Sequence, residues 1–126
     1  MTIGSHGWSH RSLAGLAPSE RWREVARSRS ELEQRLGVDV TSFAYPFGTR
    51  ADYDEATAET LAASGYRCAF TAQHGAIGPD AALYALPRVK VEGGEGDWMF
   101  RQLCSGGLDR WRWIDRAFWR WQERAA

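Results

Sequence analysis

Residues 41–48 have the sequence TSFAYPFG, an apolar run that ends in an aromatic turn. The aromatic residues in its first five positions predict a strand, and Pro46 with Gly48 predicts the turn that ends it. Ligands of α/β folds bind beyond the carboxyl ends of strands. We therefore expect Tyr45, Pro46 and Phe47 to contact a ligand, against the alternative of a plain exit from strand to loop.

A predicted helix flanks this strand on each side. The first covers Pro18–Leu36, because proline suits a first helical position and Gly37 suits the position after the last turn. The second covers about Tyr53–Ser64, with Asp52 as its predicted N-cap and Gly65 after its end.

The first helix should be amphipathic. One face is expected to carry the apolar stripe, and the other to carry ion pairs four residues apart, Arg27 with Glu31 and Glu31 with Arg35. The stripe consists of Trp22, Val25, Leu32 and Leu36.

Short apolar segments alternate with these helices, which is the pattern of a parallel α/β sheet. Three or four strands cannot close a barrel, so an exposed sheet edge remains, and that edge predicts self-association. Pro87 favours an edge position for the last strand. The further strands are expected at Thr2–Ser5, Tyr66–Thr71 and Tyr84–Val91, with loops at Gln73–Ala82 and Glu92–Asp97.

Length and charge limit the classes of function. The chain has 126 residues, which suits one domain or part of one. Sixteen basic and sixteen acidic residues cancel, so a nucleic-acid partner is not favoured. No apolar run is long enough for a transmembrane segment. Residues 1–10 lack the features of a signal peptide, and the location of the protein stays open.

The C-terminal segment differs in composition from the rest. Five of the seven tryptophans lie between Trp98 and Trp121, and a helix is expected at about Leu108–Arg124. We expect this helix to pack on the domain, with arginine stems covering apolar surface. The alternatives are a helix that lies on a membrane surface and a platform that stacks on sugars. We accordingly divide the chain into residues 1–91 and a tail of residues 92–126.

Two of the three histidines, His6 and His10, are four residues apart just after the first predicted strand. Imidazole nitrogens bind zinc and other transition metals, and small neighbouring residues would let both rings approach one ion. Surface or capping histidines are the alternative. A structural zinc site that adds Cys68 and Cys104 is disfavoured, because the cysteines lack the usual paired spacing.

The motifs GSHGWSH, SFAYPFG, SGYRCAFT and LPRV, in this order over residues 2–91, resemble those of the metal-dependent polysaccharide deacetylases. The resemblance implies a partial (β/α) barrel whose N-terminal strands are missing from this chain. It also implies a divalent metal, zinc above all, bound by His6, His10 and an aspartate. That aspartate and a second one, the general base, belong to an earlier strand and have no match here.

The resemblance further implies metal-dependent hydrolysis of N-acetyl or O-acetyl groups on a glycan. The backbone N–H near Phe47 would stabilise the oxyanion. Ala44 stands where relatives carry an orienting arginine, and Arg88 is a candidate substitute. His74, expected in a loop, is a candidate acid.

Tyr45 and Phe47 would offer ring faces to the sugar. Because a third ligand and a base are lacking, we expect the chain alone to be weakly active or inactive. The alternative is a non-catalytic carbohydrate-binding or scaffold remnant.

Overall fold

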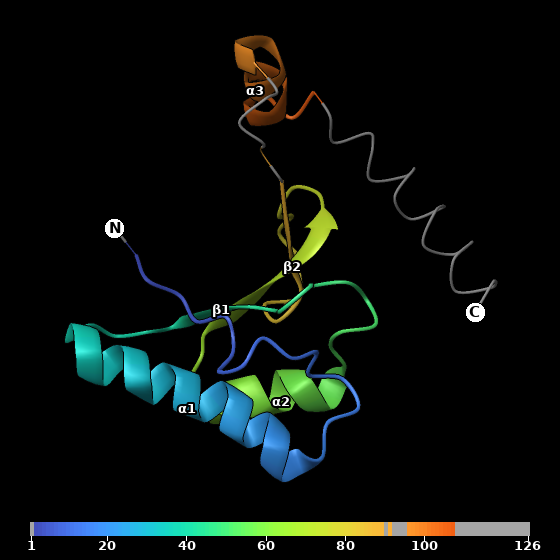
Figure 1. The fold of residues 1–126 in the computed structure, drawn as a ribbon. Coiled ribbons are helices and arrows are strands. Elements are labelled where there is room, and N and C mark those ends of the chain that lie inside the picture. The colour runs from blue at the N-terminus through green and yellow to red at the C-terminus, as the bar shows by residue number, and fades with distance from the viewer. Residues whose placement is uncertain (1, 90, 92–95, 108–126) are drawn as a thin grey trace.

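The computed structural model describes residues 2–89, 91 and 96–107, and the predicted helix at Leu108–Arg124 lies outside them. Figure 1 shows α1 and α2 together on one side of the sheet, with α3 away from both. None of the described helices has the length and apolar character needed to cross a membrane. The elements are α1 (Pro18–Leu36), β1 (Ser42–Ala44), α2 (Glu55–Ala63), β2 (Cys68–His74), β3 (Leu86–Arg88) and α3 (Gly96–Cys104).

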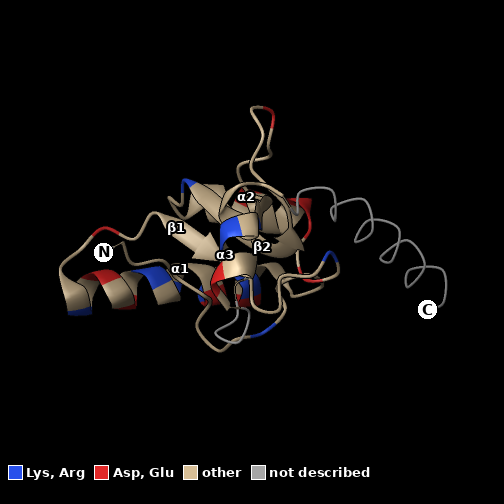
Figure 2. Cartoon of the chain, turned by 90° about the horizontal axis from the view of Figure 1, so that it is seen from above, with Lys and Arg blue, Asp and Glu red and all other residues tan. Residues whose placement is uncertain are grey.

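Helix α1 has the predicted bounds. Ala17 provides no side-chain cap, and Gly37 adopts the left-handed conformation, with φ of 64°. Acidic and basic residues follow one another along α1 (Figure 2). Arg35 pairs with Glu31 at 2.9 Å, as expected. The guanidinium of Arg27 instead lies over the Trp8 ring, 3.8 Å from its centroid.

The predicted apolar stripe of α1 is wrong in part. Trp22 is 48% exposed and Leu36 is 51% exposed, whereas Val25 is fully buried. The inward face also contains Arg21, Glu24 and Ser28. The reason is that Glu24 and Ser28 meet polar groups of the N-terminal segment, and Arg21 meets Thr60 and Asp54. The helical period alone does not reveal such partners.

The N-cap of α2 is Asp54, not Asp52, and its carboxylate accepts a hydrogen bond from Thr57 N. Asp52 is buried and accepts from both the backbone N–H and the hydroxyl of Thr49. The helix therefore begins at Glu55, two residues later than predicted, because Asp52 stabilises the loop that follows the aromatic turn.

The three strands form a parallel sheet in the order β1-β2-β3, so Pro87 lies on an edge strand as predicted. Two loop predictions are wrong. Strand β2 continues to His74, beyond the expected end at Thr71, and its ladder to β3 is irregular between Phe70 and His74. A helix, α3, begins at Gly96 inside a segment expected to be a loop.

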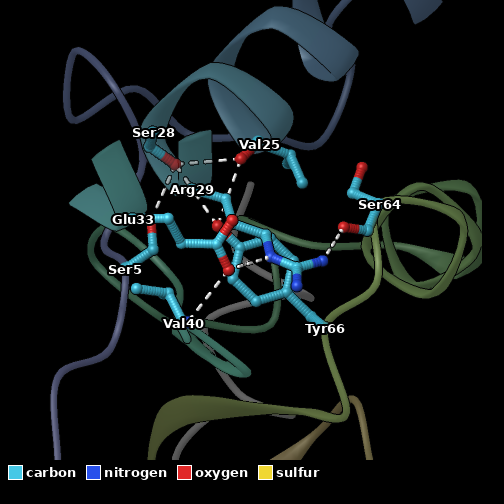
Figure 3. A network of polar contacts seen from close by, with 8 residues as sticks. All are labelled: Ser5, Val25, Ser28, Arg29, Glu33, Val40, Ser64 and Tyr66. Atoms are coloured by element: carbon cyan, nitrogen blue, oxygen red, sulfur yellow. Dashed lines mark hydrogen bonds and ion pairs between the residues drawn. The ribbon is translucent and has the colours of Figure 1, made fainter. Parts of the chain in front are cut away.

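Buried aromatic and aliphatic side chains fill the space between the sheet and the two helices, among them Val25, Phe43, Tyr45, Leu61 and Tyr66. A buried polar network crosses this layer (Figure 3). The hydroxyls of Ser5 and Ser28 are 2.7 Å apart, and Tyr66 donates to Val25 O at 3.1 Å. The first of these bonds ties the N-terminal segment to α1 directly before His6, and the second ties the residue Tyr66, ahead of β2, to the same helix.

Candidate functional site

The backbone brings the two predicted motifs to the same edge of the sheet. Ser5 pairs in parallel with Phe43 as an isolated bridge. Ser5 N donates to Ser42 O at 2.9 Å, and Ala44 N donates to Ser5 O at 2.8 Å. Because the pairing is parallel, both segments leave the sheet at the same edge. His6 follows Ser5, and the aromatic turn follows β1.

The side chains of His6, His10 and Phe47 lie together. The ring centroids of His6 and His10 are 4.9 Å apart, and those of His10 and Phe47 are 4.8 Å apart, both edge-to-face. All three residues are exposed. A ligand arriving from solvent can thus meet both imidazoles and the phenyl ring at once.

A backbone carbonyl fixes the orientation of the first imidazole. His6 Nδ1 is 2.8 Å from the carbonyl oxygen of Ala44. Because a carbonyl only accepts, the proton of the neutral ring lies on Nδ1, and Nε2 keeps its lone pair. Metal-binding histidines are commonly oriented in this way. Ala44 thus contributes its main-chain oxygen to the orientation of His6.

Two residues of this group have strained backbones. His10 has φ of 56° and Phe47 has φ of 60°, and within residues 2–89, 91 and 96–107 no other residue except glycine has a positive φ. Such conformations cost energy and concentrate at functional sites. The strain therefore marks the place where the two motifs meet.

Glu24 holds the loop between the histidines, and no sequence pattern singles it out beyond its place in α1. It is 5% exposed. Its Oε2 accepts from Trp8 N at 3.1 Å and from Ser9 N at 2.8 Å, and its Oε1 accepts from the Ser9 hydroxyl.

Burial by itself raises the pKa of Glu24. The hydrogen bonds from Ser9 and Trp8, with the charge of Arg11, outweigh burial and lower the pKa below its usual value. Glu24 is therefore ionised at neutral pH, and the three hydrogen bonds to its carboxylate are charge-assisted.

The separation of the two imidazoles is one that a shared metal ion would allow. Two imidazoles that bind zinc tetrahedrally through bonds of ~2.1 Å place their ring centroids roughly 5 Å apart, and the separation here is 4.9 Å. In the part of the chain that the structure describes, no third His, Cys, Asp or Glu completes such a group. Cys68 and Cys104 are free thiols, and they do not join the histidines in any such group.

The three residues of the aromatic turn differ in exposure. Tyr45 and Pro46 are buried, whereas Phe47 is 60% exposed. The Tyr45 ring stacks on Tyr53 at 4.7 Å, and its hydroxyl donates to Tyr84 O. Tyr45 therefore offers no ring face to a sugar, contrary to expectation. The N–H of Phe47 makes no backbone hydrogen bond within the described residues.

The other two candidate residues lie apart from the histidines. Arg88 Nε donates to Thr71 O at 2.7 Å, an interaction within the sheet. His74 is the partner of Arg88 in the register of β2 and β3. No described contact joins either residue to His6 or His10, so their proposed roles as orienting residue and acid stay predictions.

Comparison with known proteins agrees with these motifs. The family model described as polysaccharide deacetylase matches residues 1–69. YxkH of Bacillus subtilis, assigned to the polysaccharide deacetylases, is 33% identical over 94 residues. Those residues make up 75% of this chain but 33% of YxkH, so the chain spans about a third of that relative.

Solved structures show the same fold. The deacetylase PplD of Streptococcus pyogenes, determined with acetate, is 22% identical with a TM-score of 0.71, over 78% of this chain and 42% of PplD. IcaB of Ammonifex degensii is 25% identical with a TM-score of 0.59, over 75% of this chain and 43% of IcaB. The predicted α/β fold with a parallel sheet is confirmed, and it corresponds to part of the deacetylase fold. The chain belongs to the polysaccharide deacetylase family.

Proposed function

We propose that this chain is part of a metal-dependent deacetylase that hydrolyses N-acetyl or O-acetyl groups on a glycan. The observation that carries the proposal is the meeting of His6, His10 and Phe47 at one edge of the sheet, with centroid separations of 4.9 and 4.8 Å. Membership of the polysaccharide deacetylase family supports it.

His6 and His10 would hold the metal through ring nitrogens, His6 through the Nε2 that the bond to Ala44 O leaves unprotonated. A divalent ion, zinc first, supplies Lewis acidity for the acetyl carbonyl and lowers the pKa of a water molecule towards ~7. The N–H of Phe47 would donate to the developing oxyanion, a contribution of roughly 3 kcal/mol for one such donor. The exposed Phe47 ring would contact the sugar.

A non-catalytic, glycan-binding remnant is the second candidate. It is favoured by the lack of a third metal-binding side chain near the histidines among the described residues. The two candidates differ in their dependence on metal, because a remnant needs neither imidazole for its function.

Binding of a product analogue separates them. We expect fluoroacetate, followed by ¹⁹F NMR, to bind the zinc-loaded chain and to shift the amide signal of Phe47. The His6→Ala and His10→Ala variants should lose this binding, and the exposed variant Arg67→Ala should keep it. Equal binding with and without zinc, or no loss in the histidine variants, would reject the deacetylase proposal.

A further inference from the structure

The loop after the aromatic turn is hydrogen-bonded to the segment that follows His10. The carbonyl oxygen of Asp52 accepts from Leu13 N at 3.1 Å and from Ala14 N at 3.0 Å. Among the described residues, no other backbone–backbone hydrogen bond joins residues 7–14 to the sheet or to the loops beside it. Leu13 follows His10 by three residues, a Cα separation of at most roughly 11 Å. The carbonyl of Asp52 therefore fixes the main chain just after the second histidine.

The side chain of Asp52 fixes the direction of that carbonyl. Asp52 is 8% exposed. Its Oδ2 accepts from Thr49 N at 2.8 Å and from the Thr49 hydroxyl, and Asp52 N donates back to Thr49 O at 3.1 Å. An aspartate that bonds its own backbone in this way stabilises a turn. The turn begins directly after Gly48, which is held to β2 through the bond from Ala72 N to Gly48 O.

The turn thus links the two strained residues of the candidate site. His10 has φ of 56° and Phe47 has φ of 60°, and such conformations persist only where the surroundings over-determine them. Before His10, the main chain is held at Ser9 N by Glu24. After His10, it is held by the carbonyl of Asp52.

We propose that Asp52 is a positioning residue, which fixes His10 opposite Phe47 through the turn that its carboxylate closes. The two rings are 4.8 Å apart. This inference rests on the proposed function, in which His10 would hold the metal and the N–H of Phe47 would donate to the oxyanion. A displacement of about 1 Å between such groups can cost about 100-fold in rate. Asp52 itself touches neither the metal nor the substrate.

The position of His10 can be measured without metal or turnover, from the nuclear Overhauser effect between the ring protons of His10 and Phe47. We expect Asp52→Ala to lose this effect. The imidazole signals of His6 should stay unchanged, because Ala44 O orients that ring independently. A purely stabilising role of Asp52 would lower the free energy of unfolding but leave the His10–Phe47 effect in place, and that result would overturn the proposal.

Three further variants make the test specific. Asp52→Asn should restore the ring contact, because Oδ2 alone accepts from Thr49 and one amide oxygen can replace it. Thr49→Val removes one of the two bonds to the carboxylate, should weaken the ring contact in part, and keeps the test open if Asp52→Ala fails to fold. Asp39→Ala removes an exposed carboxylate and is the control, which should leave the contact unchanged. A full ring contact in both Asp52→Ala and Thr49→Val would overturn the proposal.

Zinc titration of the same variants separates this inference from the proposed function. We expect Asp52→Ala to lower zinc affinity roughly 10–100-fold, as for other residues that support metal ligands. Loss of the ring contact in Asp52→Ala, with no zinc binding even by the wild type, would reject the metal-dependent function and leave the role of Asp52 standing. Equal zinc affinity and an unchanged ring contact in Asp52→Ala would overturn this inference and leave the deacetylase proposal standing.

Discussion

Glu24 is expected to hold the loop between His6 and His10 in place, and changing its carboxylate is the sharpest test of that role. In Glu24→Ala the N–H groups of Trp8 and Ser9 lose their acceptor at once. A buried donor without a partner costs about 1–3 kcal/mol. Both residues are exposed enough for water to replace part of the loss, so we expect the free energy of unfolding to fall by about 2–4 kcal/mol.

Glu24→Gln keeps the shape and one acceptor oxygen. With that oxygen facing the two N–H groups, the new amide faces the Ser9 hydroxyl, which can turn and accept. The bonds survive without charge assistance, so a loss of about 1–2 kcal/mol is expected. This variant keeps the test open if the alanine variant fails to fold.

Zinc affinity separates positioning of the histidines from mere stabilisation. Residues that support metal ligands typically change affinity by about 10–100-fold, and we expect such a loss in Glu24→Ala and a smaller one in Glu24→Gln. Denaturant unfolding and calorimetric zinc titration are the assays. Glu20 lies on the same helix as Glu24 and forms an exposed ion pair with Arg11, which precedes the helix. Glu20→Gln is therefore the control, and it should change neither the unfolding free energy nor the zinc affinity by much. Unchanged zinc affinity in a folded Glu24→Ala protein would refute the reasoning.

Three further predictions concern the pH dependence of stability, the glycine turns and the activity of the chain. The pKa of Glu24 is lowered in the folded state, so the stability that its carboxylate contributes is present above the unfolded value of 4.5 and disappears as the pH falls through the folded value. The difference in unfolding free energy between the wild type and Glu24→Gln should therefore shrink below pH 4.5. A constant difference would contradict this. Gly48→Ala should cost more than about 2 kcal/mol, since its Cβ would lie 2.5 Å from Ala72 N at φ of 69°. Gly15→Ala, at φ of 74° with open space around it, should cost only the backbone strain of about 1–2 kcal/mol, and equal losses in denaturant unfolding would count against the steric argument. Acetate release from triacetylchitotriose by the 126-residue chain should stay near background with or without zinc, and rapid turnover would contradict the need for a further ligand and base.

Local signals predicted much of the fold. Pro18 and Gly37 gave both ends of α1, because each suits one helix end for a steric reason. The buried partners of α1 could not be predicted in this way. Glu24 and Ser28 face inward because the N-terminal segment offers hydrogen bonds to them, and hydrophobic periodicity carries no information about such bonds.

The positions of candidate site residues were predictable where a sequence motif specifies the residue type. Their exposure was less predictable, because tertiary packing decides it. His6, His10 and Phe47 are together as the motifs suggested. Tyr45 is buried because strand residues alternate between faces and its face meets the helices. His74 extends β2 because pairing with β3 overrides the loop-forming residues around it.

The central claim is that His6 and His10 jointly bind one divalent metal beside Phe47. The most direct measurement is NMR of the imidazole nitrogens during titration with zinc. One equivalent should shift Nε2 of His6 and a ring nitrogen of His10 together and leave His74 unchanged, with the response lost when either of the two histidines is replaced by alanine. Separate titration of the two rings, or zinc binding that survives both substitutions, would contradict the account.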